Sequence, residues 1–257
     1  MKILNVLKWK ISIQIAYNKK VIKIHTYNEK DKFVHNKKYY LNEEYFNNID
    51  TENKAYILGF LSSDGCVDKS TNNIKISLKN EESEIILLNK IIQELNFTGN
   101  YKIVKNNKYI ELTITSFRLK DRLLSIGIIP NKTVNLDLKK VVDNIPKCFY
   151  KDFLRGYFDG DGCISISQQK YKNSIYNVPT FHIIALTKNI KTLVSLFNAN
   201  FNFTISKEKR SKIDMSYIKV CSKNKIKFIY DFMYSENDYM YLKRKKDIFK
   251  KYLNIIS

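Results

Sequence analysis

The chain has 257 residues, 44% of them hydrophobic, which is enough for one large or two small domains with a buried core. Lysine and arginine total 45 against 25 acidic residues, and the resulting net charge of +20 favours a polyanion, nucleic acid first, as the partner. No apolar stretch approaches the ~20 residues that a membrane helix needs, so we expect no membrane partner.

Residues 1–50 form a basic N-terminal extension. Within it, KWKISIQI and KKVIKIH alternate like short strands, a pattern that fits either an ordered accessory hairpin or a flexible arm. Asp50 or Thr51 then caps a predicted helix that carries the apolar run 55–61.

The next segment, 51–147, reads as one αββαββα repeat. Apolar and polar residues alternate over 74–79 and 109–115, which predicts strands with one apolar face. Helices are expected over 81–95 and 116–127, the second ending at Gly127. A basic and hydroxylic sheet face can lie in a DNA major groove, so we predict DNA contacts from the outward residues Lys75, Ser77, Lys79, Tyr109, Thr113 and Thr115.

The second half, 148–257, repeats this order after a linker-like stretch at 135–148. Strands are expected over 163–167 and 180–186, a helix over 189–200 and a hairpin over 204–221. Two further helices are expected over 223–234 and 238–253. The predicted fold is therefore α+β, with two pseudo-symmetric αββαββα repeats.

A nine-residue motif recurs with an offset of 97 residues, as ILGFLSSDG (57–65) and LRGYFDGDG (154–162). Each copy ends an apolar helix on an Asp, where the negative end of the helix dipole disfavours a carboxylate unless a cation lies beside it. Gly59 and Gly156 allow the two helices to approach closely, which would bring Asp64 and Asp161 together. Hard oxygen donors without nearby His or Cys select Mg²⁺, with Mn²⁺ able to substitute.

These motifs resemble the LAGLIDADG homing endonuclease family in its single-chain, two-repeat form. The resemblance implies that the motif helices pack the repeats into a DNA-binding saddle. It also implies site-specific, metal-dependent cleavage of both DNA strands at a long asymmetric target, with Asp64 and Asp161 as metal ligands. The family also places a basic residue near the cleavage site, after the helix that closes each repeat. The resemblance therefore implies Lys132 in the first repeat and Lys245, chosen from 243–246, in the second as catalytic residues that stabilise charge or order solvent.

Other functions remain open at this stage. Some relatives of this family are RNA-splicing maturases or DNA-binding regulators, so RNA is a possible second partner. An intact intein is disfavoured because the chain starts at Met1 and ends in NIIS. We expect a monomer that acts on double-stranded DNA and not on a small molecule.

The four cysteines form no C-x-x-C pair, which argues against a zinc site. Four unpaired thiols fit an intracellular setting. Cys66 and Cys163 occupy equivalent positions in the two repeats, directly after the motifs, and we expect both to be small buried residues.

Overall fold

The computed structural model describes residues 9–15, 22–28, 39–172, 174–197 and 203–254, and the chain divides into two compact units, Met1–Tyr40 and Leu41–Ser257. In the first unit, β1 (Trp9–Ile15) pairs antiparallel with β2 (Ile22–Asn28), in register from Trp9 opposite Asn28 to Ile15 opposite Ile22. The alternating pattern of the extension therefore forms a hairpin.

Residues 41–50, which the sequence assigns to the extension, belong to the second unit. The side chains of Tyr45 and Phe46 are buried there, and the Tyr45 hydroxyl donates to Glu94 Oε2 at 2.9 Å. This segment carries its own apolar side chains into the core of the first repeat, so the boundary between units lies about ten residues before the predicted one.

The first repeat follows the predicted order of helices and strands. Its elements are α1 (Glu52–Ser63), β3 (Gly65–Val67), β4 (Asn73–Lys79), α2 (Glu82–Glu94), β5 (Lys102–Val104), β6 (Tyr109–Thr115) and α3 (Phe117–Ile126). Thr51 caps α1 by accepting from the Lys54 N–H, and Gly127 ends α3 in the left-handed conformation at φ 119°.

The second repeat has the same order and one further helix. Its elements are α6 (Tyr150–Asp161), β7 (Cys163–Tyr171), β8 (Ser174–Leu186), α7 (Thr187–Leu196), β9 (Ile205–Lys207), β10 (Met215–Val220), α8 (Lys223–Met233) and α9 (Lys243–Leu253). The last helix begins at Lys243 rather than near 238, because Asp238 accepts from Ser235 and holds a turn ahead of it.

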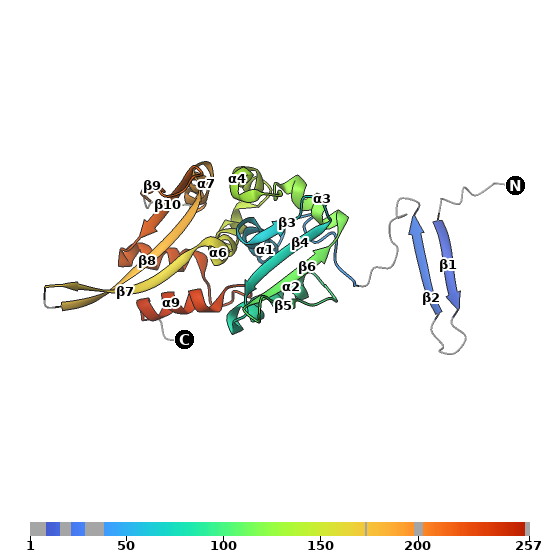
Figure 1. The fold of residues 1–257 in the computed structure, drawn as a ribbon, viewed down its shortest axis with the longest axis horizontal. Helices are drawn as coiled ribbons and strands as arrows, with labels where there is room; N and C mark the ends of the chain where they lie inside the picture. The colour runs from blue at the N-terminus through green and yellow to red at the C-terminus, as the bar shows by residue number, and fades with distance from the viewer. Residues whose placement is uncertain (1–8, 16–21, 29–38, 173, 198–202, 255–257) are drawn as a thin grey trace. The chain divides into compact units, whose positions relative to one another are not determined.

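The two antiparallel sheets have matching strand orders, β3-β4-β6-β5 and β7-β8-β10-β9. Figure 1 shows α1 and α6 side by side between the two sheets, so the motif helices form the seam of the second unit. This arrangement confirms the predicted fold of two pseudo-symmetric αββαββα repeats.

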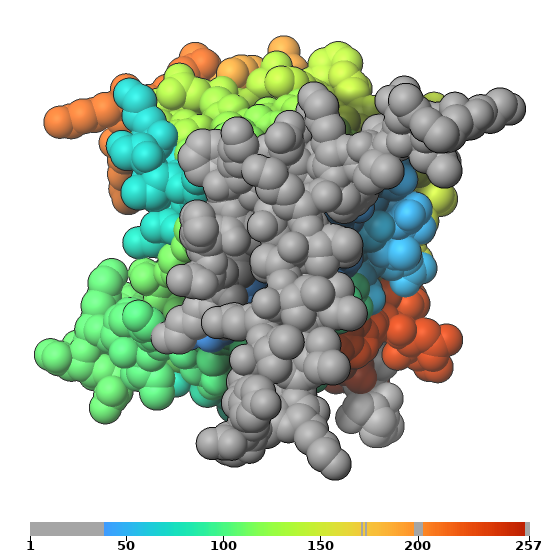
Figure 2. All heavy atoms as spheres, turned by 90° about the vertical axis from the view of Figure 1, so that its right-hand side faces the viewer, coloured from blue at the N-terminus to red at the C-terminus, as the bar shows by residue number. Residues whose placement is uncertain are grey.

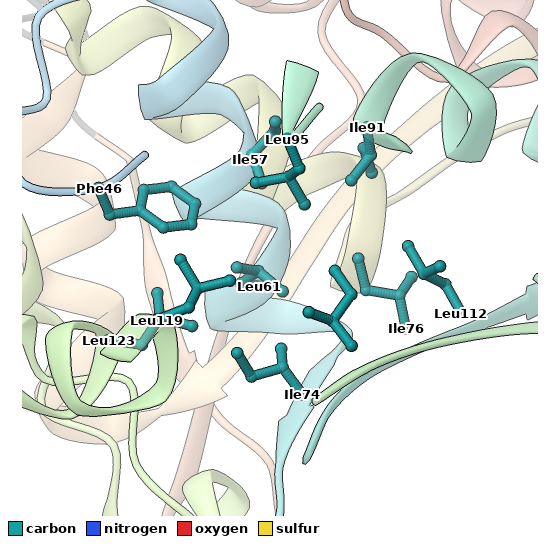
Figure 3. A pocket seen from close by; sticks show the side chains of 11 residues that line it. Phe46, Ile57, Leu61, Ile74, Ile76, Ile91, Leu95, Leu112, Leu119 and Leu123 are labelled. Atoms are coloured by element: carbon teal, nitrogen blue, oxygen red, sulfur yellow. The ribbon is translucent and has the colours of Figure 1, made fainter. Parts of the chain in front are cut away.

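Each sheet buries one face under its helices. In the first repeat, Ile74 and Ile76 of β4 face Leu61 of α1, Ile91 of α2 and Leu119 of α3 around a small apolar cavity (Figure 3). Period-two alternation in β4 and β6 turns their polar side chains to the opposite face, where these residues are exposed or half-buried.

The stretch 135–148 is not a linker, contrary to the sequence interpretation. It begins at the last residue of the short helix α4 (Lys132–Asn135), contains the short helix α5 (Leu138–Val142), and runs into the 3₁₀ turn Lys147–Phe149. Leu138 and Val141 are buried, and the Asn189 side chain of α7 bonds the Leu138 N–H and the Leu136 carbonyl. Apolar side chains at helical spacing fix this segment between the repeats.

Two structural features border the polar faces. The β7–β8 ribbon extends well past the body of the second repeat (Figure 1), whereas β3 spans only three residues. The β3–β4 turn (cyan) and the β5–β6 turn (green) project on one side in Figure 2, one at each end of the first sheet. Among the described residues, no helix is long and apolar enough to cross a membrane.

Candidate active site

The seam between α1 and α6 is a direct backbone contact at two glycines. A Cβ on Gly59 would lie 2.0 Å from the Phe153 carbonyl oxygen, and a Cβ on Gly156 would lie 2.0 Å from the Tyr56 carbonyl oxygen. Positions 56 and 153 are equivalent in the two repeats, so a local two-fold axis relates these two contacts. Gly160 packs on Ser63, its own equivalent position near the other helix end, so the helices run parallel. Both carboxyl-terminal helix ends therefore meet on one side of the molecule.

Asp64 and Asp161 stand at these two helix ends. Asp64 caps α1, and its N–H bonds the Phe60 carbonyl, while Asp161 is the last residue of α6. Gly160 packs so closely on the other helix end that its Cβ would lie 3.2 Å from the Asp64 nitrogen. The two carboxylates are thus neighbours, and both side chains reach solvent.

The environment raises the pKa of both carboxyl groups. Desolvation is the largest cause for each, and for Asp161 the negative charge of Asp64 is the next. The positive charges of Lys132 and Lys245 oppose these effects at both groups, and that of Arg244 does so at Asp64. A carboxylate pair in this state favours the binding of further positive charge.

Lys132 and Lys245 occupy equivalent places at the two helix ends. Lys132 Nζ donates to the Leu61 carbonyl at 3.2 Å, and Lys245 Nζ donates to the equivalent Phe158 carbonyl at 2.7 Å. Desolvation lowers the pKa of each lysine to about 8, although nearby carboxylates oppose the shift. The structure thus places the two predicted lysines beside the two predicted carboxylates.

The two lysines differ in how many of their donors are occupied. Lys245 is 4% exposed and also donates to the carbonyls of Asp159 at 2.8 Å and Gly162 at 2.6 Å. Lys132 is half-buried and has one such acceptor among the described residues. Lys245 therefore clamps the end of α6, while Lys132 retains N–H groups that are available to a substrate.

Asp159, the extra acid of the second motif, lies inside the protein. Its Oδ2 accepts from the Tyr56 hydroxyl and from the Leu242 N–H, each at 2.7 Å, so it joins α1, α6 and the start of α9. Burial raises its pKa to about 6. The matching residue of the first repeat, Ser62, bonds the Leu58 carbonyl of its own helix instead.

A separate acidic group lies at the opposite ends of the motif helices. Carboxylate oxygens of Glu52, Asp152 and Asp238 approach within 4.8 Å of one another. The buried Arg155 pairs with two of these three acids, with Nη2 2.7 Å from Asp152 and Nη1 3.3 Å from Asp238. Arg155 thus points into the second repeat, where its Nε donates to the Met240 carbonyl at 3.0 Å.

The predicted DNA-contacting residues share the outer face of the first sheet. Lys75 pairs with Thr113, Lys79 with Tyr109, and Thr115 with Asn73 across β4 and β6, while Ser77 pairs with Glu111. Glu111 lies 4.0 Å from Lys75 and accepts from Thr113, so the face carries one acid among its basic and hydroxyl groups.

The second sheet has an equivalent outer face that the sequence analysis did not assign. His182 of β8 pairs with Cys163 of β7 and Lys219 of β10, and Ser165 pairs with Thr180. The alternation of apolar and polar residues over 163–167 and 180–186 is the sequence signal that could have identified this face.

The two motif cysteines correct a prediction. Cys66 and Cys163, expected to be buried, are both exposed. Each lies one residue from an inward-facing side chain, Val67 or Ile164, so strand alternation turns the thiol outward.

Comparison with known proteins identifies a family to which the second repeat is similar. The LAGLIDADG endonuclease family model matches residues 154–256, about two fifths of the chain, and the match starts at the first residue of the second motif. The predicted resemblance is therefore confirmed.

Solved structures share the architecture at low sequence identity. The LAGLIDADG meganuclease I-AabMI bound to uncleaved DNA has a TM-score of 0.54 and 13% identity, covering 78% of this chain and 90% of that chain. The meganuclease I-SmaMI bound to uncleaveable DNA has a TM-score of 0.53 and 14% identity over the same shares. The homing endonuclease I-LtrWI bound to target DNA has a TM-score of 0.53 and 16% identity, covering 83% and 91%.

A curated relative from Methanocaldococcus jannaschii carries the name probable translation initiation factor IF-2. It is 25% identical over 116 residues, which are 45% of this chain and 9% of that protein.

Proposed function

We propose that this chain, whose second repeat matches the LAGLIDADG endonuclease model and whose fold is that of LAGLIDADG meganucleases, is a site-specific endonuclease that cuts both strands of double-stranded DNA. The observation that carries the proposal is the meeting of Asp64 and Asp161 at the α1–α6 seam beside Lys132 and Lys245. Both motif helices come from one chain, so a monomer would supply the whole site.

The donor set fits a divalent cation. Two solvent-accessible carboxylates stand at the negative ends of two parallel helices, and desolvation raises the pKa of each, so a bound cation would stabilise their ionised forms. Asp64 and Asp161 would hold Mg²⁺, or Mn²⁺ in its place, and the bound ion would polarise the scissile phosphate and activate water. Imidazole and thiolate donors are not required.

The protein's own groups would perform the remaining work. Lys132, with N–H groups to spare, would stabilise the charge that develops on the phosphate oxygens. Lys245, with its donors committed to α6 carbonyls, would hold Asp161 in place. The outer faces of both sheets would follow the major groove on either side of the cut.

A plasmid assay tests this function. The target is the sequence obtained by joining the DNA that flanks the reading frame, cloned in a supercoiled plasmid beside a scrambled control. We expect linear product from the target plasmid with Mg²⁺ and none with EDTA or from the scrambled plasmid. Intact plasmid in Mg²⁺ and in Mn²⁺ would contradict an endonuclease, and selective binding of the flanking transcript would then favour a maturase.

A further inference from the structure

Arg244 is one of the four basic residues 243–246 from which the sequence analysis chose Lys245 instead. It is the second residue of α9, next to Lys245, and its Nε donates to Glu84 Oε1 at 2.6 Å. Glu84 is 1% exposed and lies in the first turn of α2 in the other repeat, whereas the Arg244 side chain is 44% exposed. A buried acid of one repeat therefore fixes the orientation of a half-exposed arginine of the other.

The two terminal nitrogens of this guanidinium are available to a ligand. Within the part of the chain that the structure describes, no hydrogen bond reaches the Nη1 or Nη2 atom of Arg244. The neighbouring Lys245 inserts at the end of α6, so the first turn of α9 lies beside the two carboxylates. The charge of Arg244 also acts on Asp64.

We propose that Arg244 is a further catalytic residue of this centre, and that its two terminal nitrogens bind a backbone phosphate of DNA at the cleavage site. Glu84 is its positioning residue. The inference rests on the proposed function. An arginine held through Nε presents Nη1 and Nη2 as a planar fork, which matches two phosphate oxygens, whereas a lysine offers only a point charge.

The first repeat has no counterpart of this residue. The residue before Lys132 is Asn131, which is exposed and adopts a left-handed conformation at φ 54°. The two scissile phosphates would therefore meet unlike surroundings. The consequence is that loss of Arg244 slows the cutting of one strand more than the other.

The test measures cutting of each strand separately, in single turnover at saturating protein, with each strand of the target labelled in turn. We expect Arg244→Gln to slow one strand by ~10²-fold, the typical effect of one lost electrostatic donor, and the other strand by less than ~3-fold. Arg244→Lys, which keeps the charge but loses the fork, should slow the same strand by ~10-fold. Lys243→Gln, one residue away and paired on the surface with Asp247, is the matched control and should cut like the parent.

A double variant separates binding of phosphate from a purely structural ion pair. Arg244→Gln leaves the buried Glu84 without its partner and is expected to lower the melting temperature, and Glu84→Gln added to it should restore that temperature. If Arg244 only joins the repeats, the double variant also restores cutting of both strands. Restored cutting, or equal slowing of both strands in the single variants, would overturn the proposal.

Binding without cleavage distinguishes this inference from the proposed function. Affinity for the target duplex is measured against salt in Ca²⁺, the ion present with uncleaved DNA in a structure of I-SmaMI. Loss of one phosphate contact should make the slope of log K against log salt shallower by about 0.9 in Arg244→Gln. An unchanged slope would contradict the phosphate contact. If the salt slope changes in Arg244→Gln but the parent protein never cuts DNA, the phosphate contact stands and the proposed endonuclease activity is rejected.

Discussion

The glycine contact at the seam leads to a quantitative prediction for Gly59→Ala. The new Cβ would lie 2.0 Å from the Phe153 carbonyl oxygen and 2.9 Å from the Tyr157 nitrogen, and both are backbone atoms of α6. No side-chain rotation relieves these contacts, so the helices would have to separate by about 1 Å. Alanine gains about 1 kcal/mol of helix propensity over glycine, but overpacking against backbone costs more, and we expect a net destabilisation of at least about 2 kcal/mol.

The same displacement should reach the active site. Asp64 and Asp161 follow the seam directly, and a misplacement of about 1 Å can slow an enzyme by ~10²-fold. Urea denaturation of the metal-free protein measures the stability, and single-turnover cutting below the melting temperature measures the rate. Gly156→Ala should behave in the same way, because its Cβ meets the Tyr56 carbonyl oxygen at the same 2.0 Å.

Gly160→Ala is the matched control. Its Cβ would contact the Ser63 side chain, with Oγ at 1.9 Å, so Ser63→Gly in the same chain should recover most of the lost stability. No second-site change of this kind is available for Gly59, whose contacts are main-chain atoms. If Gly59→Ala were as stable as the parent, or more stable by the propensity gain, the direct packing of α1 on α6 would be refuted.

The remaining predictions concern charge. Asp64→Asn and Asp161→Asn should each abolish linear product while binding of the target survives. The stability of the metal-free protein should be unchanged or slightly raised, because the carboxylates no longer repel each other. Full linearisation of the plasmid by either variant would contradict the two-carboxylate metal site. Lys132→Met should slow cutting by ~10²–10³-fold at unchanged affinity for DNA, and a parent-like rate would contradict its catalytic role. Lys245→Met should slow cutting and also lower the melting temperature, because it leaves carbonyl groups at the end of α6 unpaired. Asp159 has a folded-state pKa raised to about 6, so its stabilisation is present below pH ~4 and is lost as the pH rises through 6. The stability of the parent relative to Asp159→Asn should fall by about 2 kcal/mol from pH 4 to 7 in denaturant titrations, and a constant difference would contradict this. Binding should involve at least ~5 phosphates and give a slope of about −4.5 or steeper in log K against log salt, and a slope near zero would exclude DNA as the main partner.

The sequence by itself determined the repeat, the motif helices and the alternation of the strands. These features depend on local periodicity, and two copies at a constant offset make the local signal specific. The equivalence of Asp64 with Asp161, and the polar face of β4 and β6, follow from residue order alone. The exposed thiols of Cys66 and Cys163 obey the same alternation, and the expectation of burial failed because it relied on residue type instead.

Tertiary structure alone decided which groups surround the carboxylates. Lys245 could not be separated from its basic neighbours in 243–246 by residue type, and only the packing of α9 against α6 puts its Nζ, rather than theirs, on the Phe158 carbonyl. The bond from Arg244 to Glu84 joins residues 160 positions apart, and no local pattern records it. Helical periodicity predicts which face of a helix is buried, but the partner across an interface depends on how distant elements pack, which is why the contact of Arg244 with Glu84 emerged only from the folded chain.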